Sequence, residues 1–352
     1  MTEALPLDLE PMLAAPAADL PAGPDWSYEP KWDGFRIIAH LSPAGPQLIS
    51  RGAKPMNRYF PEVVAAMEPL GSLGVVLDGE LIIIGSAGLD FDALQQRVHP
   101  ASSRVERLSR ETPAEYVAFD LLQLNGEDLR GRPLSERRSL LEDVLKLAPA
   151  SIYLTPYTRD PALGRRWFQE FEGAGLDGII AKRWSHPYLA GRRGWVKIKH
   201  ERTADCVVIG YRLSVAQDGV ASILLGLYDQ EGRMQFVGHT SGLDSVARHT
   251  LLGELKGLEA PRDPEMGRRP GAPSRWSQDR SADWVSVRPD LVCEVSFDKL
   301  QSGERFRHAA RLIRWRPDRD PKSCTFDQIR PPSEFQIADI LATRVRPRLN
   351  SL

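Results

Sequence analysis

A lysine held between two backbone constraints dominates the N-terminal part of the sequence, in the stretch Lys-Trp-Asp-Gly-Phe-Arg at residues 31–36. Pro30, directly before Lys31, fixes φ and favours an extended chain. Gly34 permits a sharp turn of the backbone just after it. An amine attacks an electrophile only when it is neutral, so a lysine becomes a nucleophile where burial and nearby cations disfavour its charged form. An isolated motif of this kind is more often a surface lysine beside a turn, so a nucleophile requires partners elsewhere in the chain.

Length and composition predict a two-domain protein that works in the cytoplasm. The chain has 352 residues, more than one average domain. No apolar run approaches the length of a membrane span. Its three cysteines are far apart, which argues against a zinc site or a disulfide framework and fits a reducing cytoplasm. Residues 1–24 lack the order of a signal peptide, and we expect a loosely held lead-in segment there.

The distribution of charge indicates local contact with phosphates. The net charge of −1 argues against a general affinity for nucleic acid. Basic residues are nevertheless concentrated in two segments. One contains Arg305, Arg307, Arg311, Arg314, Arg316 and Arg319, and the other contains Arg183, Arg192, Arg193, Lys197 and Lys199. Two basic segments on a neutral protein suggest phosphate sites, although two solvated faces would give the same pattern.

An acidic pair interrupts an apolar segment at residues 75–84, Val-Val-Leu-Asp-Gly-Glu-Leu-Ile-Ile-Ile. One interpretation is a tight hairpin, which Asp-Gly favours. The other is a single buried strand whose carboxylates, Asp78 and Glu80, point into a polar cavity. Buried carboxylates need a partner or a metal, so the second interpretation predicts a site.

A second acidic residue precedes a glycine at Asp177-Gly178, and an apolar strand ending in Lys182 follows. The stretch Trp-Val-Lys-Ile-Lys at residues 195–199 comes next. In a strand, Lys197 and Lys199 share one face. Paired lysines facing one way are well placed to hold phosphate oxygens, but a half-buried strand with a wet side would show the same alternation.

The predicted fold class is α+β, with two domains. Strands are expected at 35–39 and 116–122, and helices at 60–70, 91–98, 134–147 and 163–171. After residues 200–205 the pattern changes to five short strands and one helix, which suits a β-barrel of the oligonucleotide-binding type, the OB-fold. We therefore expect an N-terminal domain at 25–202, an OB-fold domain at 203–340 and a tail at 341–352.

In their order along the chain, these motifs resemble those of the covalent nucleotidyltransferases, which include ATP-dependent DNA ligases, RNA ligases and messenger-RNA capping enzymes. The resemblance covers about residues 29–321 and implies that the N-terminal domain is an adenylation domain. In this family the lysine of Lys-x-Asp-Gly forms a phosphoramidate with a nucleoside monophosphate. The matching positions are Lys31, Asp33 and Gly34.

The resemblance also implies roles for other residues. Arg36 and Arg51 are similar to the arginines that contact the ribose and the 5′-phosphate of the nicked strand. Glu80 resembles the acid that binds the ribose hydroxyls and reaches a metal, and Phe119 resembles the aromatic that stacks on the base. The remaining positions expected to bind the nucleotide are Glu29, Pro30, Lys197, Lys199 and Arg316.

Two positions depart from the family pattern. Asp177, expected with Glu80 to bind Mg²⁺ or Mn²⁺, stands where the family usually has Glu. Arg319 replaces the usual lysine in the C-terminal motif that begins at Arg316 and orients the leaving pyrophosphate. Both departures keep the sign of the charge, so they bear on the site more than on the function.

The stretches at residues 29–36 and 284–295 are most similar to bacterial ATP-dependent DNA ligases, in particular the stand-alone C-type and the ligase domain of the D-type end-joining enzymes. This implies a monomer that takes AMP from ATP onto Lys31 and seals nicks in double-stranded DNA during repair. A primase-polymerase or a DNA-end-binding protein would be its partner. The alternatives are an RNA ligase or capping guanylyltransferase with the same lysine, or a non-catalytic nucleic-acid-binding module.

Overall fold

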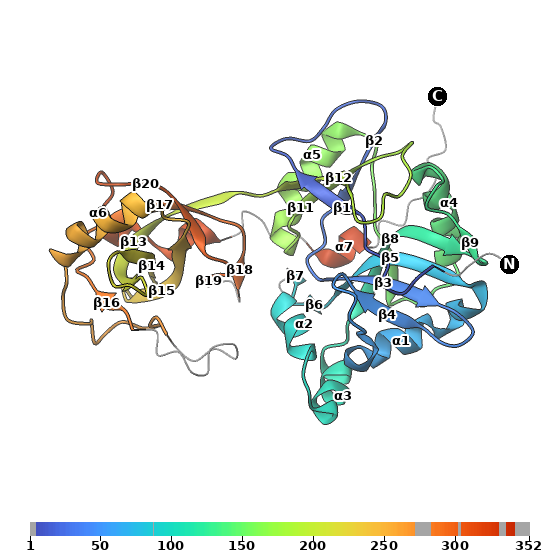
Figure 1. Ribbon diagram of the computed structural model, residues 1–352, viewed down its shortest axis with the longest axis horizontal. Helices are drawn as coiled ribbons and strands as arrows, with labels where there is room; N and C mark the ends of the chain where they lie inside the picture. The colour runs from blue at the N-terminus through green and yellow to red at the C-terminus, as the bar shows by residue number, and fades with distance from the viewer. Residues whose placement is uncertain (1–4, 87, 272–282, 302–303, 331–335, 342–352) are drawn as a thin grey trace. The chain divides into compact units, whose positions relative to one another are not determined.

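The protein forms two compact units, seen in a computed structural model that describes residues 5–86, 88–271, 283–301, 304–330 and 336–341 (Figure 1). The first unit comprises residues 1–199 and 331–352, and the second comprises residues 200–330. The first unit combines helices with two β-sheets and the second is a β-barrel, which agrees with the predicted α+β fold class and C-terminal OB-fold. None of the described helices is long and apolar enough to cross a membrane.

Two β-sheets form the framework of the first unit. One sheet has the order β1-β12-β11-β2, and the other has the order β10-β8-β5-β3-β4, with β9 paired to β8. The first sheet contains β1 (Leu13–Pro16), β12 (Arg193–Lys199), β11 (Gly178–Arg183) and β2 (Trp26–Pro30). The second contains β10 (Ile152–Leu154), β8 (Glu115–Leu124), β5 (Val75–Ile82), β3 (Phe35–Leu41), β4 (Gln47–Ser50) and β9 (Glu127–Asp128). A short hairpin, β6 (Ile84–Gly85) and β7 (Gly88–Leu89), follows β5.

Helices cover the apolar faces of both sheets. The α-helices of this unit are α1 (Pro61–Met67), α2 (Phe91–Arg97), α3 (Ser102–Glu111), α4 (Leu134–Leu145), α5 (Pro161–Glu170) and α7 (Ile337–Leu341). Short 3-10 turns occur at η1 (Asn57–Tyr59), η2 (Glu68–Leu73) and η3 (Phe171–Ala174). In the second sheet, Ile37 and Leu77 pack with Phe60 and Leu141 in one core. The helix α3 was not predicted from the sequence.

The acidic segment at residues 75–84 is a strand over most of its length and not a hairpin at Asp-Gly. Residues 75–82 form β5, which pairs with β3 on one side and β8 on the other. The pairing with β8 shifts between Asp78 and Gly79, because Asp78 lies opposite Asp120 and Gly79 lies opposite Ala118. Phe119 is therefore the extra residue of a β-bulge, a feature that often re-aims a side chain beside a site.

The N-terminal segment is packed against the unit, contrary to the loosely held lead-in that we expected. Leu5, Leu9 and Met12 are buried in one cluster with residues of the second sheet. Further along, β1 pairs in parallel with β12 of the first sheet. We call residues 5–17 the N-terminal strap, because this segment contacts both sheets.

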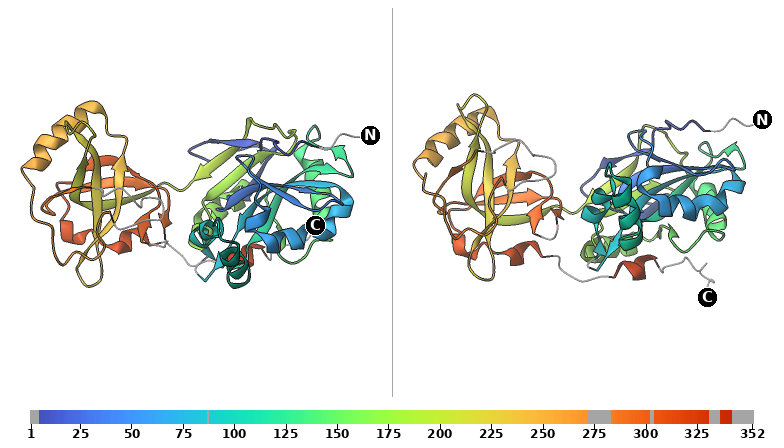
Figure 2. Two further views of the ribbon diagram at one scale, coloured as in Figure 1. Left: turned by 60° about the horizontal axis from the view of Figure 1, so that its bottom comes forward. Right: turned by 90° about the horizontal axis from the view of Figure 1, so that it is seen from below.

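The second unit is a closed barrel (Figure 2). Its strands are β13 (Arg202–Leu213), β14 (Val220–Tyr228), β15 (Met234–Ser241), β16 (Val285–Ser286), β17 (Val292–Phe297) and β20 (Ala310–Trp315). The order β14-β15-β20-β17-β13 closes through pairing of β13 with β14, and β15 runs parallel to β20. The unit also contains the helix α6 (Ser245–Lys256), the hairpin β18 (Leu300–Gln301) with β19 (Arg305–Phe306), and the 3-10 turns η4 (Pro321–Ser323) and η5 (Phe326–Ile329).

The C-terminal boundary differs from the predicted one. We assigned residues up to 340 to the OB-fold domain, but α7 belongs to the first unit. Its residues Ile337, Ile340 and Leu341 are buried with Trp32 and Ile179 of that unit. Apolar burial is the physical reason, and a periodicity argument on so short a helix cannot choose between two cores. The predicted tail lies outside the described residues beyond position 341.

Candidate active site

Side chains from both sheets of the first unit line one cavity of about 260 Å³. The lining residues are Leu13, Ala14, Glu29, Pro30, Lys31, Trp32, Arg36, Arg51, Glu80, Phe119, Ile180, Lys182, Arg193, Trp195 and Lys197. Eight of the ten positions predicted to be catalytic or nucleotide-binding are among them. Lys199 and Arg316, the other two, lie outside this lining.

Backbone and side-chain contacts fix the position of Lys31. Its N–H donates to the carbonyl of Gly178 (2.9 Å), and the N–H of Asp177 donates to the carbonyl of Lys31 (3.0 Å). The ammonium Nζ lies 2.5 Å from Oδ2 of Asp177. The next residue, Trp32, donates from its indole Nε1 to Oγ1 of Thr155 (2.9 Å). These contacts fix both the backbone and the side chain of Lys31, which is therefore not a surface lysine beside a turn.

Gly34 is required because another backbone comes very close, not because of a left-handed turn. A Cβ at this position would lie 1.9 Å from the carbonyl oxygen of Leu81 and 2.9 Å from Cγ of Glu80. The φ angle of Gly34 is not positive. Its N–H donates to Oε1 of Glu80 (3.1 Å). The close approach thus brings the Lys-x-Asp-Gly motif against β5.

Cations gather around Lys31. Lys199 Nζ lies 3.0 Å from Oδ2 of Asp177, the same oxygen that contacts Lys31. Lys197 lines the cavity, and burial, together with the charges of Lys199, Lys31 and Arg51, lowers its pKa. Cations held this closely repel one another, and an anionic ligand such as a phosphate relieves that repulsion.

Asp177 contacts the Lys31 ammonium, and Glu80 lines the same cavity as Lys31. Burial raises the pKa of Glu80 to about 7, although Lys31 and Arg36 oppose the shift. No group of three or more His, Cys, Asp or Glu side chains suited to a metal occurs among the described residues. Mg²⁺ binds through one or two carboxylates together with phosphates and water, so Asp177 and Glu80 fit such an ion without a protein cage.

Arg36 is held rigidly at the cavity wall. Its Nε and Nη2 donate to the two oxygens of Asp78 (2.9 and 2.6 Å), and Asp78 is fully buried. Its guanidinium lies over the rings of Phe119 (5.2 Å) and Trp195 (4.7 Å). Phe119 therefore reaches the cavity as predicted, but it shares its surroundings with Trp195, which we did not single out.

Lys182 was noticed in the sequence but given no role. It is 1% exposed, lines the cavity, and its Nζ lies 2.7 Å from Oε2 of Glu29. The same Nζ donates to the carbonyl of Phe119 (3.1 Å). Burial raises the pKa of Glu29 and lowers that of Lys182, while their ion pair opposes both shifts. The period of two from Ile180 to Lys182 in a strand was the signal that both residues face the cavity.

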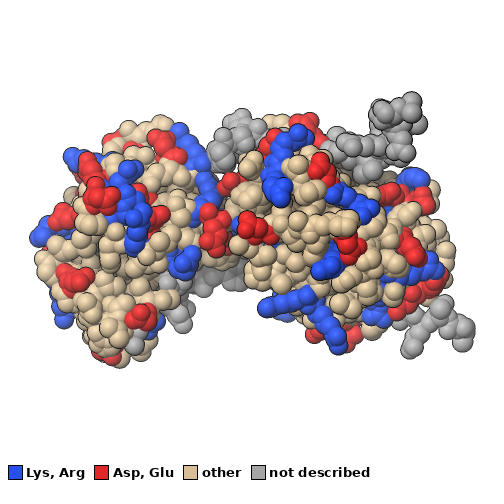
Figure 3. Space-filling model, turned by 90° about the horizontal axis from the view of Figure 1, so that it is seen from above, with Lys and Arg blue, Asp and Glu red and all other residues tan. Residues whose placement is uncertain are grey.

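Arg316 belongs to the second unit, just after β20. Its guanidinium pairs with Asp205 (2.9 Å) and Asp318 (2.9 Å), and Arg319 pairs with the same Asp205 (3.4 Å). The C-terminal motif is therefore an ordered ion-pair network. On the face drawn in Figure 3, Lys and Arg are interspersed with Asp and Glu in each unit, so no large field of one sign covers that face.

The chain is similar to known DNA ligases. Residues 11–199 match the family model of the ATP dependent DNA ligase domain, and residues 216–319 match that of the ATP dependent DNA ligase C terminal region. The chain is 46% identical over 338 residues to DNA ligase C2 of Mycolicibacterium smegmatis, covering 92% of this chain and 95% of the relative. It is also 46% identical over 349 residues to DNA ligase C of Mycobacterium tuberculosis, covering 95% and 97%.

A solved structure is similar as well. It is a mycobacterial DNA ligase D complexed with ATP and MES, with a TM-score of 0.50 and 31% sequence identity. The match covers 91% of this chain and 98% of the solved one.

Proposed function

The chain belongs to the ATP-dependent DNA ligases, and we propose that it seals nicks between a 3′-hydroxyl and a 5′-phosphate in duplex DNA through a lysyl-AMP intermediate on Lys31. The observation that carries this proposal is the position of the Lys31 ammonium. It lines the cavity, contacts Asp177, and is accompanied by Lys197 and Lys199.

In the first step, the neutral amine of Lys31 attacks the α-phosphorus of ATP. A P–N bond forms, the P–O bond to pyrophosphate breaks, and the proton of the amine passes to Asp177 and from there to water. Phosphoryl transfer of this kind depends on positioning and on neutralising charge on the phosphate oxygens. Lys197 and Lys199 supply positive charge for the α-phosphate, and Asp177 orients Lys31 and accepts its hydrogen bond.

The nucleotide itself is held by the remaining cavity residues. Phe119 and Trp195 provide aromatic surface for the base, while Glu29 and Lys182 present a polar edge beside it. Arg36 and Glu80 contact the ribose. A divalent cation, Mg²⁺ or Mn²⁺, would be held by Asp177 and Glu80 and would neutralise phosphate charge when bound.

The later steps transfer AMP to the nick. The 5′-phosphate takes AMP from Lys31, and the 3′-hydroxyl then displaces AMP to form the phosphodiester. Arg51 contacts the 5′-phosphate in these steps. Arg316 in the second unit orients the leaving pyrophosphate in the first step only. The enzyme acts as a monomer on nicked DNA in the cytoplasm, at the nucleoid, and serves repair with a primase-polymerase or a DNA-end-binding protein.

A labelling experiment tests the proposal. The protein is incubated with α-labelled ATP or GTP and a divalent cation and then separated on a denaturing gel. Lys31→Ala removes the nucleophile, and Lys146→Ala, an exposed lysine at the end of α4, serves as the matched control. We expect label from ATP on the wild type and on Lys146→Ala, and none on Lys31→Ala.

A chase with a nicked duplex then distinguishes the substrates. Loss of label together with a sealed DNA strand supports the ligase. Sealing only with an RNA strand would indicate an RNA ligase, and label only from GTP would indicate a capping enzyme. Nucleic-acid binding without any label would leave only a binding module.

A further inference from the structure

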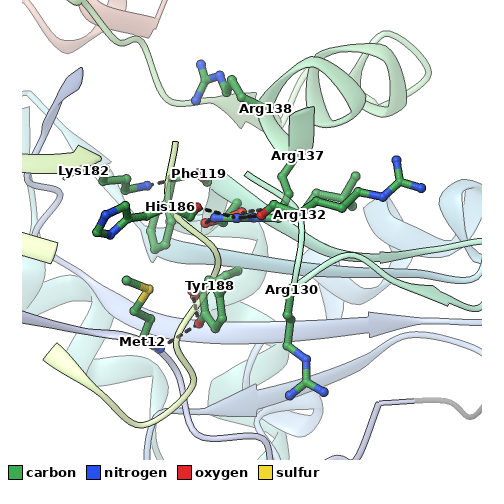
Figure 4. Close-up of polar contacts among 12 residues, drawn as sticks. Met12, Phe119, Arg130, Arg132, Arg137, Arg138, Lys182, His186 and Tyr188 are labelled. Atoms are coloured by element: carbon green, nitrogen blue, oxygen red, sulfur yellow. Dashed lines mark hydrogen bonds and ion pairs between the residues drawn. The ribbon is translucent and has the colours of Figure 1, made fainter. Parts of the chain in front are cut away.

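One buried hydroxyl connects the N-terminal strap to the wall of the nucleotide cavity. Tyr188 lies in the connection between β11 and β12 and is 4% exposed. Its Oη accepts a hydrogen bond from the backbone N–H of Met12 (2.8 Å) and donates one to Oδ2 of Asp78 (2.7 Å). Figure 4 shows Tyr188 pointing toward Met12. The same Asp78 carboxylate binds the Arg36 guanidinium in a bidentate manner.

The remaining surroundings of Tyr188 restrict its ring. The guanidinium of Arg137 lies 5.8 Å from the ring centroid, and the ring packs edge-on against Trp195 with centroids 6.0 Å apart. Arg137 itself donates to the backbone carbonyls of Arg132 and His186 (Figure 4). Arg137 and Trp195 thus both contact the Tyr188 ring, and Arg137 also binds the backbone of the connection at His186.

The hydroxyl is also chemically suited to a fixed link. Burial and the charge of Asp78 raise the pKa of Tyr188 well above its usual value, so it remains an O–H donor at neutral pH. Removing the hydroxyl would leave one oxygen of a buried carboxylate with one partner fewer, and the N–H of Met12 without its acceptor. Unsatisfied buried groups of this kind are costly.

We propose that Tyr188 is a positioning residue for the sealing reaction: through Asp78 it holds Arg36 in one orientation at the cavity wall and makes that orientation depend on the N-terminal strap. The inference rests on the proposed function. Tyr188 touches neither nucleotide nor DNA in this scheme; Leu13 and Ala14, directly after Met12, line the cavity themselves. The N-terminal strap, Tyr188, Asp78 and Arg36 therefore form one continuous series of contacts that ends at the cavity wall.

The test compares Tyr188→Phe with Tyr28→Phe in the full-length protein. Tyr28 is a matched control, because it is also buried and its hydroxyl also makes a hydrogen bond, to the carbonyl of Pro21 (2.7 Å). Pro21 lies in the same N-terminal region, but Tyr28 makes no hydrogen bond to Asp78. Lysyl-AMP formation and sealing of a nick by pre-adenylated enzyme are measured separately. Arg36 contacts the ribose in the proposed function, so we expect Tyr188→Phe to slow lysyl-AMP formation by roughly tenfold. The thermal midpoint of Tyr188→Phe should be no lower than that of Tyr28→Phe.

A double-mutant cycle separates positioning from general destabilisation. Arg36→Lys keeps the charge but cannot form the bidentate pair with Asp78. If Tyr188 acts through Arg36, adding Tyr188→Phe to Arg36→Lys changes the rate less than twofold. If the two losses multiply, or if Tyr188→Phe behaves like Tyr28→Phe, the inference is wrong. A wild type that takes no label from ATP would instead overturn the proposed function.

Discussion

Lys31 and Asp177 contact each other through both backbone and side chain. The N–H of Asp177 donates to the Lys31 carbonyl at 3.0 Å, and the Lys31 ammonium lies 2.5 Å from Oδ2 of Asp177. The backbone hydrogen bonds continue the pairing of β2 with β11 just beyond the ends of both strands. This pairing places the two side chains within reach of each other. Asp177, with a side chain one methylene shorter than that of a glutamate, reaches the Lys31 ammonium.

Asp177→Asn removes the charge that Lys31 and Lys199 share while keeping the shape of the side chain. We expect lysyl-AMP formation to fall about 100-fold or more, since a preorganised charged contact at the reacting group is lost. Asp177→Glu keeps the charge and should remain within about tenfold of the wild type. Single-turnover labelling with ATP checks both variants. Equal activity of the Asn and Glu variants would contradict a role for the charge.

Glu80→Gln tests the raised pKa of Glu80. Because burial raises that pKa from 4.5 to about 7, the folded protein binds a proton more tightly than the unfolded chain. The free energy of unfolding therefore falls as pH rises between about 4.5 and 7, by an amount on the order of 2 kcal/mol. The Gln variant lacks this loss, so its stability relative to the wild type should rise across that window and stay constant above it. Urea unfolding of the ligand-free protein at several pH values measures the difference, and a constant difference would exclude the shift.

Lys182→Met leaves the Glu29 carboxylate buried without its closest cation. Breaking a buried pair by removing one partner costs about 3–5 kcal/mol of stability. Adding Glu29→Gln to Lys182→Met should recover part of that loss, because the uncompensated charge is then gone. Chemical unfolding of the two single variants and the double variant checks the coupling. Additive losses would show that the pair is not energetically linked.

Gly34→Ala introduces a Cβ 1.9 Å from the Leu81 carbonyl oxygen. The start of β3 must move away from β5, and we expect a loss of stability of about 1–3 kcal/mol or more together with loss of labelling at Lys31. Gly52→Ala is the control, because a Cβ there meets no atom within 4 Å. Thermal unfolding and ATP labelling should be unchanged in that control. A Gly34→Ala variant as stable and active as Gly52→Ala would refute the close approach.

Arg316→Ala tests whether Arg316 of the second unit acts only in the first step, the formation of lysyl-AMP. Arg316 is expected to act only while pyrophosphate leaves, so the variant should form lysyl-AMP at least about tenfold more slowly. Sealing of a nick that already carries AMP should be nearly normal. Arg314→Ala, which removes a neighbouring arginine paired with Glu294 (2.7 Å), serves as the control. Equal loss in both steps would point to a general disturbance of the Asp205 network.

The sequence by itself determined most of the local structure around the motifs. Pro30 and the alternation in β12 were enough to predict an extended chain before Lys31 and two lysines on one face. The strand at residues 75–82 was one of two interpretations, because an Asp-Gly step favours a turn locally. Pairing on both sides with β3 and β8 decided for the strand, since a central strand satisfies all its backbone groups.

The tertiary structure decided the contacts that depend on distant segments. The packing of the strap was missed because its alanines and prolines resemble a free lead-in, and Leu5, Leu9 and Met12 have a core to enter only once the sheets have formed. The bulge that turns Phe119 toward the cavity depends on the register of two strands. The burial of Lys182 is explained only by its ion pair with Glu29, which lies far away in the sequence. Local spacing in the sequence thus predicted most of the residues that meet at the cavity. Only long-range packing decided how they are held, because buried charges and bulged strands are stabilised by partners far along the chain.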